Sequence, residues 1–269
     1  MKKIDKAVIM ARGLGTRMRK AAASQLSGEQ AKIADTGIKA LIPIDRPFLD
    51  YILSALADAG FRRVCLIIGP EHDAIRNYYG QLKTDRVRIE FAIQEKPRGT
   101  ADAVAAAEKF AGDDGFVVIN SDNYYPVIAF EGLAKLDGPG TAVFDKDGML
   151  AGSNIPPERI SAFAVVEVRD GKMVRILEKP SADVLAKLTP PIGLSMQCWR
   201  FDKRIFEACR NIKPSPRNEL ELPDAVQYTI DKLGAQYAAL MFKAPVLDMS
   251  SREDIAAVAA KLKGVKVVL

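Results

Sequence analysis

Histidine, tryptophan and cysteine are scarce in this chain of 269 residues, which holds one, one and three of them. Because His72 is the only histidine, mechanisms that need a histidine cluster are excluded, and a Ser-His-Asp triad would depend on that one side chain. Cys65, Cys198 and Cys209 are widely spaced and form no CxxC pair, so neither a zinc site nor a disulfide framework is indicated. We expect the cysteines to fill the core and His72 to lie at the start of a helix.

Long apolar runs and a strong charge of one sign are also absent. No apolar run approaches about 18 residues, and the first residues lack the apolar segment that a signal peptide needs, so we expect a cytoplasmic protein without a membrane partner. The net charge of +5 is modest, and no basic run is interleaved with aromatic residues. We therefore expect no polymeric nucleic acid as a partner. The hydrophobic content of 48% is sufficient for a sizeable core.

Short apolar runs alternate with helix-like segments through the first half of the chain. The runs predict strands at 6–10, 63–68, 87–93 and 116–119, with helices near 47–59, 71–80 and 101–111 between them. This alternation is typical of a parallel sheet with helices on both faces and right-handed crossovers.

After about residue 140 the pattern changes. Two strand candidates, 162–169 and 173–177, flank Asp170-Gly171, a dipeptide typical of a tight hairpin turn. Ser251 and Asp254 form a plausible capping box for a last helix at 252–263. We predict a single α/β domain over residues 1–269, Rossmann-like, with a mixed, mainly parallel central sheet and helices on both faces.

A loop rich in glycine and arginine follows the first predicted strand and begins at Ala11. Gly13 and Gly15 lack a Cβ, so the backbone can turn tightly and bring its N–H groups against a polyphosphate. Arg17 and Lys39 add positive charge. The sequence from position 12 to position 39 contains six basic residues and only two acidic residues. This excess favours an anionic ligand. The third glycine of a dinucleotide fingerprint and the Lys-Ser or Lys-Thr of a Walker A loop are both missing.

A second cluster, residues 94–102, lies between a predicted strand and the alanine-rich helix. The amide of Gln94 carries a donor and an acceptor together, which suits the edge of a pyrimidine that presents both. Uracil and thymine share such an edge, although an amide can also flip to meet a purine. Gly99 lets the backbone approach a planar base. Thr100 caps the alanine-rich helix, contacts a nucleotide, or does both.

Two acids each follow a short apolar run. Asp122 ends the segment Asn120-Ser121-Asp122, at the carboxyl end of a predicted central strand, where open α/β sheets bind their ligands. Asp248 follows Val246-Leu247 in the same way. Carboxylates are natural ligands of Mg²⁺, so the two acids are candidates to share one ion. The alternative is that Asp122 only fixes a turn.

The tripeptide Glu178-Lys179-Pro180 ends the second strand of the predicted hairpin. Proline keeps Lys179 extended. Glu178 is placed to accept hydrogen bonds from hydroxyl groups, and Lys179 to hold a phosphate as a point charge. Taken alone, the tripeptide is equally consistent with an exposed ion pair at a strand end.

Taken in order, these segments resemble the sugar-nucleotide pyrophosphorylases, which join a nucleoside triphosphate to a sugar 1-phosphate. The matching pieces, spread from residue 13 to 254, are GLGTRMR, IKALIPI, QEKPRGTADAV, INSDN, EKP and VLDMSSREDI. The resemblance implies a nucleotide-binding half, residues 1–140, and a sugar-phosphate-binding half, residues 141–269, within one domain. It implies a nucleoside triphosphate and a sugar 1-phosphate as partners, with UTP or dTTP favoured, and Mg²⁺ as cofactor.

The resemblance also implies a role for each candidate residue. Arg17 and Lys39 would be catalytic through their contacts with phosphates. Asp122 and Asp248 would bind Mg²⁺. The sugar phosphate would face Glu178 and Lys179. The nucleotide would contact Ala11, Gly13, Gly15, Thr16, Gln94, Gly99 and Thr100.

The chemistry is reasonable without the family. The second ionisation of a phosphate monoester has a pKa of about 6, so a sugar 1-phosphate is mostly dianionic at neutral pH and needs no general base. Positioning and charge neutralisation remain for the protein to supply. We expect in-line attack of a sugar-phosphate oxygen on the α-phosphorus, with Mg²⁺, Arg17 and Lys39 stabilising the departing pyrophosphate.

Some features depart from the family pattern. Arg12 stands where relatives usually have glycine or alanine, so either it points to solvent or nucleotide binding is altered. Ala164 stands where many relatives have glycine beside the sugar. The segment between Arg19 and Lys39 looks longer than usual, which makes it a candidate lid.

Two other functions remain open. A glycosyltransferase that uses a finished nucleotide sugar commonly has an Asp-x-Asp pair, of which Asn120-Ser121-Asp122 supplies one acid. The other open function is a binding protein of the same fold that has lost catalysis. The observation that suggests it is Arg12. A homo-oligomer is possible through the apolar segments from 222 to 241.

Overall fold

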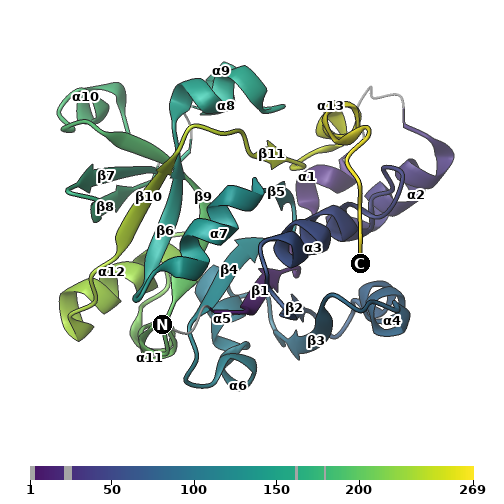
Figure 1. The fold of residues 1–269 in the computed structure, drawn as a ribbon, viewed down its shortest axis with the longest axis horizontal. Helices are drawn as coiled ribbons and strands as arrows, with labels where there is room; N and C mark the ends of the chain where they lie inside the picture. Colours follow the sequence, from purple (N-terminus) through teal and green to yellow (C-terminus); the bar gives the residue numbers. More distant parts are fainter. Residues whose placement is uncertain (1–3, 21–25, 161–162, 179) are drawn as a thin grey trace.

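One nine-stranded sheet runs through both halves of the chain (Figure 1). The strand order is β3-β2-β1-β4-β9-β6-β10-β8-β7. The computed structural model describes residues 4–20, 26–160, 163–178 and 180–269. The strands of the sheet are β1 (Lys6–Met10), β2 (Arg63–Ile68), β3 (Arg88–Ile93), β4 (Phe116–Asn120), β6 (Gly140–Phe144), β7 (Val165–Arg169), β8 (Lys172–Leu177), β9 (Ile192–Phe201) and β10 (Ala238–Phe242).

The sheet is mixed, as predicted. Strands β3, β2, β1 and β4 pair in parallel, and β6 and β10 form a further parallel pair. Strand β9 runs antiparallel to β4, β6 and β7, and β8 runs antiparallel to β10 and β7. A second, two-stranded sheet pairs β5 (Asn123–Tyr124) with β11 (Leu247–Asp248).

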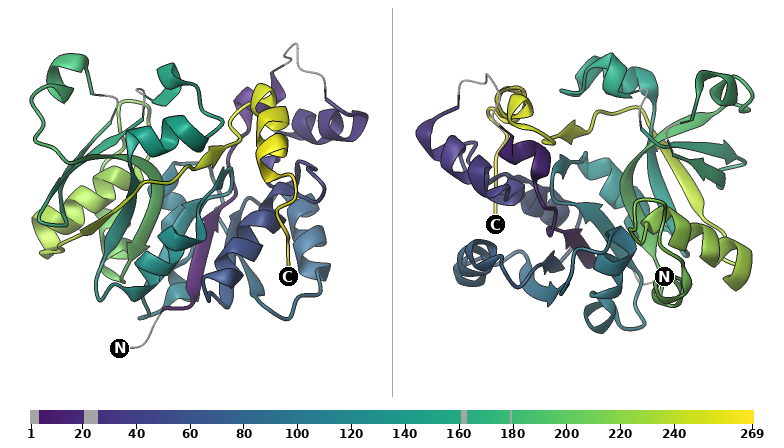
Figure 2. Two further views of the ribbon diagram at one scale, coloured as in Figure 1. Left: turned by 45° about the horizontal axis from the view of Figure 1, so that its top comes forward. Right: turned by 180° about the vertical axis from the view of Figure 1, so that it is seen from behind.

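Helices cover both faces of the large sheet (Figure 2). The sheet separates two apolar cores. Successive strand side chains point to opposite faces, so β1 contributes Ala7 and Ile9 to one core and Val8 and Met10 to the other. This explains why β1 reads as a continuous apolar run. The helices are α1 (Thr16–Arg19), α2 (Gly28–Thr36), η1 (Lys39–Leu41), α3 (Phe48–Asp58), α4 (Asp73–Gln81), α5 (Thr100–Ala105), α6 (Glu108–Ala111), α7 (Val127–Lys135), α8 (Lys146–Gly152), α9 (Pro157–Ile160), α10 (Ala182–Leu185), α11 (Arg204–Asn211), α12 (Leu222–Leu233) and α13 (Arg252–Leu262).

Local predictions are mostly confirmed. Asp170 and Gly171 both adopt positive φ, 50° and 70°, and turn the chain tightly between β7 and β8. The Asp254 carboxylate accepts hydrogen bonds from the Ser251 N–H (2.7 Å) and hydroxyl (3.0 Å) at the start of α13. The prediction of one helix at 101–111 is wrong, because α5 and α6 are separate there. All three cysteines are buried, as expected of core residues.

The candidate lid and the apolar segment from 222 to 241 are described only in part or pack within the chain. In the candidate lid, residues 21–25 lie outside the described residues, and α2 is fixed by a Gln30 side-chain bond to the Pro43 carbonyl (2.9 Å). Leu222 and Val226, from the segment that suggested an oligomer, pack in the chain's own second core, so an oligomer stays a prediction. Of the helices in the described part of the chain, none is long and apolar enough to span a membrane.

Arg252 ties the last helix to the first loop of the chain. This buried side chain donates from Nε to the Met18 carbonyl (2.7 Å) and forms an ion pair with Asp35 in α2. Strand β11 leads directly into α13, so Arg252 also fixes the position of Asp248 relative to the glycine loop.

We expect Arg252→Met to lower the free energy of unfolding by about 1–3 kcal/mol, because it deletes buried hydrogen bonds and a charge pair while keeping the apolar stem. Urea titration followed by the fluorescence of Trp199, the only tryptophan and a fully buried one, would measure the change. Lys261→Met, at an exposed position of the same helix, is the matched control. Equal midpoints for the two variants would contradict the role of Arg252.

Candidate active site

Two pockets meet at the carboxyl ends of the central strands. The first has a volume of about 510 Å³ and is lined by the loop after β1, the segment around Lys39, Gln94 and Gly99. The second has a volume of about 530 Å³ and is lined by residues of the second half, among them Glu178. Both are lined by Arg17, Asn120 and Asp122. The two pockets therefore adjoin each other at these three residues, and groups bound in the two pockets would lie next to each other there.

Two glycines join the loop after β1 to the segment that carries Lys39. Gly15 has a φ of +61°, and a Cβ on it would lie 2.2 Å from the Gly37 carbonyl oxygen. Gly37 itself has a φ of +77°. Gly13 differs, because a Cβ on it would meet no protein atom within 4 Å, and it lines the first pocket. Gly15 therefore serves backbone packing, whereas Gly13 leaves the pocket floor open.

The amide of Gln94 is fixed in one orientation. Its Nε2 donates to the Gly99 carbonyl (3.0 Å) and to the Asp102 carboxylate (2.9 Å). Neither group can donate in return, so a flipped amide would set oxygen against oxygen. Gln94 Oε1 accepts no hydrogen bond from the residues that the structure describes and remains the acceptor at this end of the first pocket.

Gly99 and Thr100 bring a distant segment against the pocket. A Cβ on Gly99 would lie 2.4 Å from the Leu220 carbonyl oxygen, so only glycine admits the backbone of Leu220 here. The alternative that Thr100 caps its own helix is wrong, because Gly99 is the N-cap and the Thr100 hydroxyl accepts from the Leu222 N–H (2.8 Å) at the start of α12. Thr100 still lines the first pocket.

Asp122 lies just beyond β4 and pairs with Lys39 at 2.7 Å. Arg17 is exposed on α1 and forms no ion pair with any residue in the described part of the chain. These two cations and the acid surround the wall shared by the pockets. Because Lys39 is paired with Asp122, Arg17 supplies the uncompensated positive charge where the two pockets meet.

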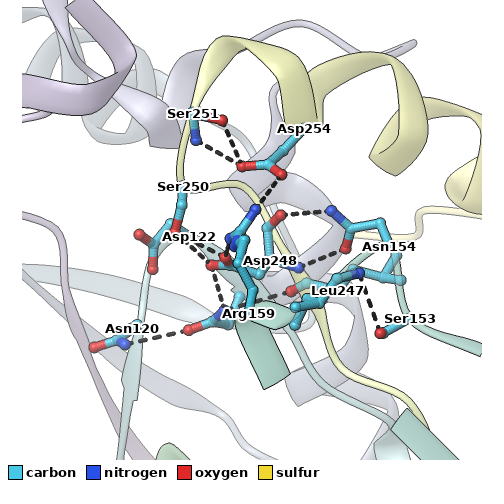
Figure 3. A network of polar contacts seen from close by, with 12 residues as sticks. Asn120, Asp122, Ser153, Asn154, Arg159, Leu247, Asp248, Ser250, Ser251 and Asp254 are labelled. Atoms are coloured by element: carbon cyan, nitrogen blue, oxygen red, sulfur yellow. Dashed lines mark hydrogen bonds and ion pairs between the residues drawn. The ribbon is translucent and has the colours of Figure 1, made fainter. Parts of the chain in front are cut away.

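Asp248 is held in place by neighbours from several elements (Figure 3). It lies opposite Asn123 across the β11–β5 pair and accepts from the Asn123 amide (3.0 Å). The Ser250 hydroxyl donates to it at 2.7 Å. Arg159, from α9, forms ion pairs with both Asp248 and Asp254. The carboxylate is thus oriented before any ligand arrives.

The charge of Asp248 is poorly stabilised despite these contacts. The pKa of Asp248 is raised to about 6, first by burial and then by the nearby charge of Asp122, while Ser250 and Arg159 oppose the change. Two carboxylates that repel each other in this way would gain from a cation between them. Asp122 and Asp248 are therefore the acids of the site that could hold a metal.

The second pocket holds the remaining candidates. Glu178 is exposed and lines the pocket, and Ala164 is buried in its wall. Lys179 lies outside the described residues. Sequence reasoning missed Arg159, Ser195 and Arg217, which also line this pocket. No local signal marks them, since each lies far along the chain from Asp122 and is brought to it by the sheet.

Arg12 does not point to solvent. Its side chain is only 6% exposed and forms an ion pair with Glu71, from Nη2 to Oε1, at 3.1 Å. Gly69 makes room for it, since a Cβ there would lie 2.4 Å from Arg12 Nε. His72 begins α4, as expected, and its Nδ1 accepts from the Gly69 N–H (3.0 Å). Arg12 nevertheless lines the first pocket.

Comparison with known proteins gives relatives along almost the whole chain. The chain is 30% identical over 231 residues to the low-salt glycan biosynthesis nucleotidyltransferase Agl11 of Haloferax volcanii, covering 84% of this chain and 57% of the relative. It is 30% identical over 227 residues to a glucose-1-phosphate thymidylyltransferase of Streptomyces griseus, with the same coverage. The chain thus spans less than two-thirds of the length of these relatives.

The fold is also found among solved structures. A UDP-glucose pyrophosphorylase complexed with UDP-glucose superimposes with a TM-score of 0.74 at 18% identity, covering 98% of this chain and 100% of the other. The family model described as nucleotidyl transferase matches residues 6–262. Because that match includes the glycine loop, the central acids and α13, the chain belongs to the nucleotidyl transferase family.

Proposed function

We propose that this chain is a sugar-1-phosphate nucleotidyltransferase, which transfers a nucleoside monophosphate to a sugar 1-phosphate and releases pyrophosphate. The observation that carries the proposal is the pair of pockets with a shared wall at Arg17, Asn120 and Asp122. Two substrates that react with each other need such adjoining sites. The names of the relatives support the same chemistry.

In this proposal residues 1–140 bind the nucleotide and residues 141–269 bind the sugar phosphate. The triphosphate lies against the loop after β1, where Gly13 leaves space and Ala11, Gly15 and Thr16 line the pocket. Glu178 faces the sugar phosphate from the second pocket, and Lys179 is assigned there from the resemblance alone.

The reaction needs charge neutralisation more than proton transfer. A dianionic sugar-phosphate oxygen attacks the α-phosphorus, and pyrophosphate departs with the electron pair of the broken P–O bond. Arg17 lacks a carboxylate partner among the described residues, so its full charge is available to the phosphates at the shared wall. Lys39 is held at the same wall by Asp122.

Mg²⁺ fits the acids of this site. No group of three or more His, Cys, Asp or Glu forms a metal cluster in the part of the chain that the structure describes, whereas Mg²⁺ usually takes one or two carboxylates together with substrate phosphates and water. Asp122 and Asp248 would supply those carboxylates. The ion would supply charge neutralisation and alignment of the phosphates. It would also offset the burial and the repulsion by Asp122 that raise the pKa of Asp248.

The fixed amide of Gln94 supports UTP or dTTP as the nucleotide. Its free group is the acceptor Oε1, which matches a base with an imino N–H at its edge. Uracil and thymine have such a group at N3, whereas cytosine and adenine present a ring nitrogen acceptor there. Guanine shares the imino N–H, so GTP is the nearest competitor.

Pyrophosphate release in the presence of Mg²⁺, each nucleoside triphosphate and a panel of sugar 1-phosphates tests the proposal. We expect Arg17→Ala and Asp122→Ala each to lower turnover by about 10²-fold or more, by analogy with loss of an oxyanion donor. Lys203→Ala, which breaks an exposed ion pair with Asp113, serves as the control. Full activity in Arg17→Ala would exclude its catalytic role, and silence of the wild-type chain across the panel would favour a binding protein.

The two loop glycines predict opposite outcomes for one substitution. Gly13→Ala should fold normally, since its Cβ meets no protein atom, and should raise KM for the nucleotide if the triphosphate lies over it. Gly15→Ala should lower the thermal unfolding temperature, because its Cβ would collide with Gly37 and φ is positive. Thermal melts and initial rates on the same samples measure both. Normal KM in Gly13→Ala would place the triphosphate elsewhere.

Base selectivity is expected to depend on Gln94. Wild-type kcat/KM should be higher for UTP and dTTP than for CTP and ATP. Gln94→Met keeps the volume but removes the acceptor, so it should lower kcat/KM for UTP by about 10-fold, the value of one hydrogen bond. The ratio of UTP to CTP should fall with it. An unchanged ratio would mean that another group recognises the base.

A further inference from the structure

Arg12 is a buried cation whose hydrogen bonds are incomplete. Its Nε and Nη1 are buried and make no hydrogen bond within the described part of the chain, where no other arginine has such unpaired buried nitrogens. Arg252 is equally buried, with 9% exposed, yet its Nε donates to a carbonyl at 2.7 Å. Unpaired buried N–H groups on a charged side chain are costly, so the resting position of Arg12 is held weakly.

The ion pair with Glu71 is also loose. Arg12 Nη2 lies 3.1 and 3.2 Å from the two Glu71 carboxylate oxygens. Charge-assisted hydrogen bonds are usually shorter, about 2.7–2.9 Å. The Glu71 side chain is 50% exposed, so solvent screens the attraction. The pKa of Glu71 is lowered first by a backbone hydrogen bond and only then by Arg12. The ion pair is therefore weak enough to be exchanged for a stronger anion, although a buried guanidinium left with no anion at all would be costly.

Arg12 is placed beside the position assigned to the triphosphate. It precedes Gly13, the residue with open space above it, and lines the same pocket as Lys39. An arginine that leaves one anion needs another, and phosphate oxygens are strong acceptors for a guanidinium. Neutral base edges offer less in return for the lost carboxylate.

We infer that Arg12 is a further nucleotide-binding residue, which exchanges the Glu71 carboxylate for a phosphate oxygen when a nucleoside triphosphate enters the first pocket. This rests on the proposed function only in requiring that a nucleotide binds there. The exchange gives Arg12, one of the departures noted in the sequence, a role as a ligand contact. Glu71 then acts as a competing anion that holds Arg12 until the phosphate arrives.

Calorimetric titration with UTP and with uridine, in the presence of Mg²⁺, tests the exchange. Arg12→Ala should weaken UTP binding by about 10- to 100-fold, the range for hydrogen bonds to charged groups, and leave uridine binding unchanged. Arg12→Gln, which keeps most of the length, should show the same loss. Glu71→Gln should strengthen UTP binding by a few-fold, because the competing carboxylate is gone. Arg76→Ala, in α4 and outside both pockets, is the matched control.

Each contrary result has its own meaning. Equal or tighter UTP binding in Arg12→Ala would show that Arg12 only packs against the loop or obstructs the pocket. An equal loss for uridine would place the contact on the nucleoside, and weaker binding in Glu71→Gln would make Glu71 a support for Arg12; either overturns the exchange. Since the readout is binding, UTP affinity without pyrophosphate release would contradict the proposed activity alone. No UTP binding by the wild-type chain would overturn both.

Discussion

The close approach of two backbones, at Gly15 and Gly37, is the constraint on which the rest of the site depends. A side chain on Gly15 would overlap the Gly37 carbonyl, so two segments meet here only because both positions lack a Cβ. This contact carries the loop after β1 to the start of η1, where Lys39 reaches Asp122. Backbone packing therefore positions the loop and Lys39, and the ion pair between Lys39 and Asp122 then fixes the cation against the acid.

The second acid depends on a different support. Asp248 belongs to a two-residue strand, β11, whose only paired strand within the described residues is the equally short β5. So small a sheet is stable only because its flanks are tied down: the Met249 N–H donates to the Asp122 carbonyl (2.8 Å), and α13 is fixed to the first loop by Arg252. Segments more than 200 residues apart in the chain are thus joined through Arg252. A substitution that displaces α13 would therefore also displace Asp248, although α13 lies outside the pockets.

Sequence reasoning predicted the elements and the chemistry better than the contacts. Alternating runs were sufficient for the strands of the first half, and the position of Asp122 beyond β4 follows from the parallel-sheet rule. The role of Gly15 was only half predicted, because nothing local indicates that position 37 lies against it. The hydrogen bond of Thr100 to the Leu222 N–H could not be predicted either, since the two residues lie 122 positions apart in the chain. Arg159 and Ser195 could not be predicted at all. They line one pocket with Asp122 and Asp248 only in the folded chain, where α9 and β9 are brought near these acids. Residue type alone does not reveal that placement.

Without a ligand, the site contains both a carboxylate and arginines whose charges are incompletely compensated. This combination restricts which ligands the site can bind favourably. On one side, burial and the charge of Asp122 raise the pKa of Asp248 despite its ion pair with Arg159. On the other, Arg12 has two buried nitrogens without acceptors among the described residues, and Arg17 has no ion-pair partner among them. A simple anion would satisfy the arginines and worsen the acids, and a simple cation would do the reverse. A metal–triphosphate complex, the ligand of the proposed function, carries both charges and would therefore lower the free energy at both ends of the pocket. The unsatisfied groups therefore argue for a site that has kept the charge distribution of an enzyme acting on metal-bound nucleotides.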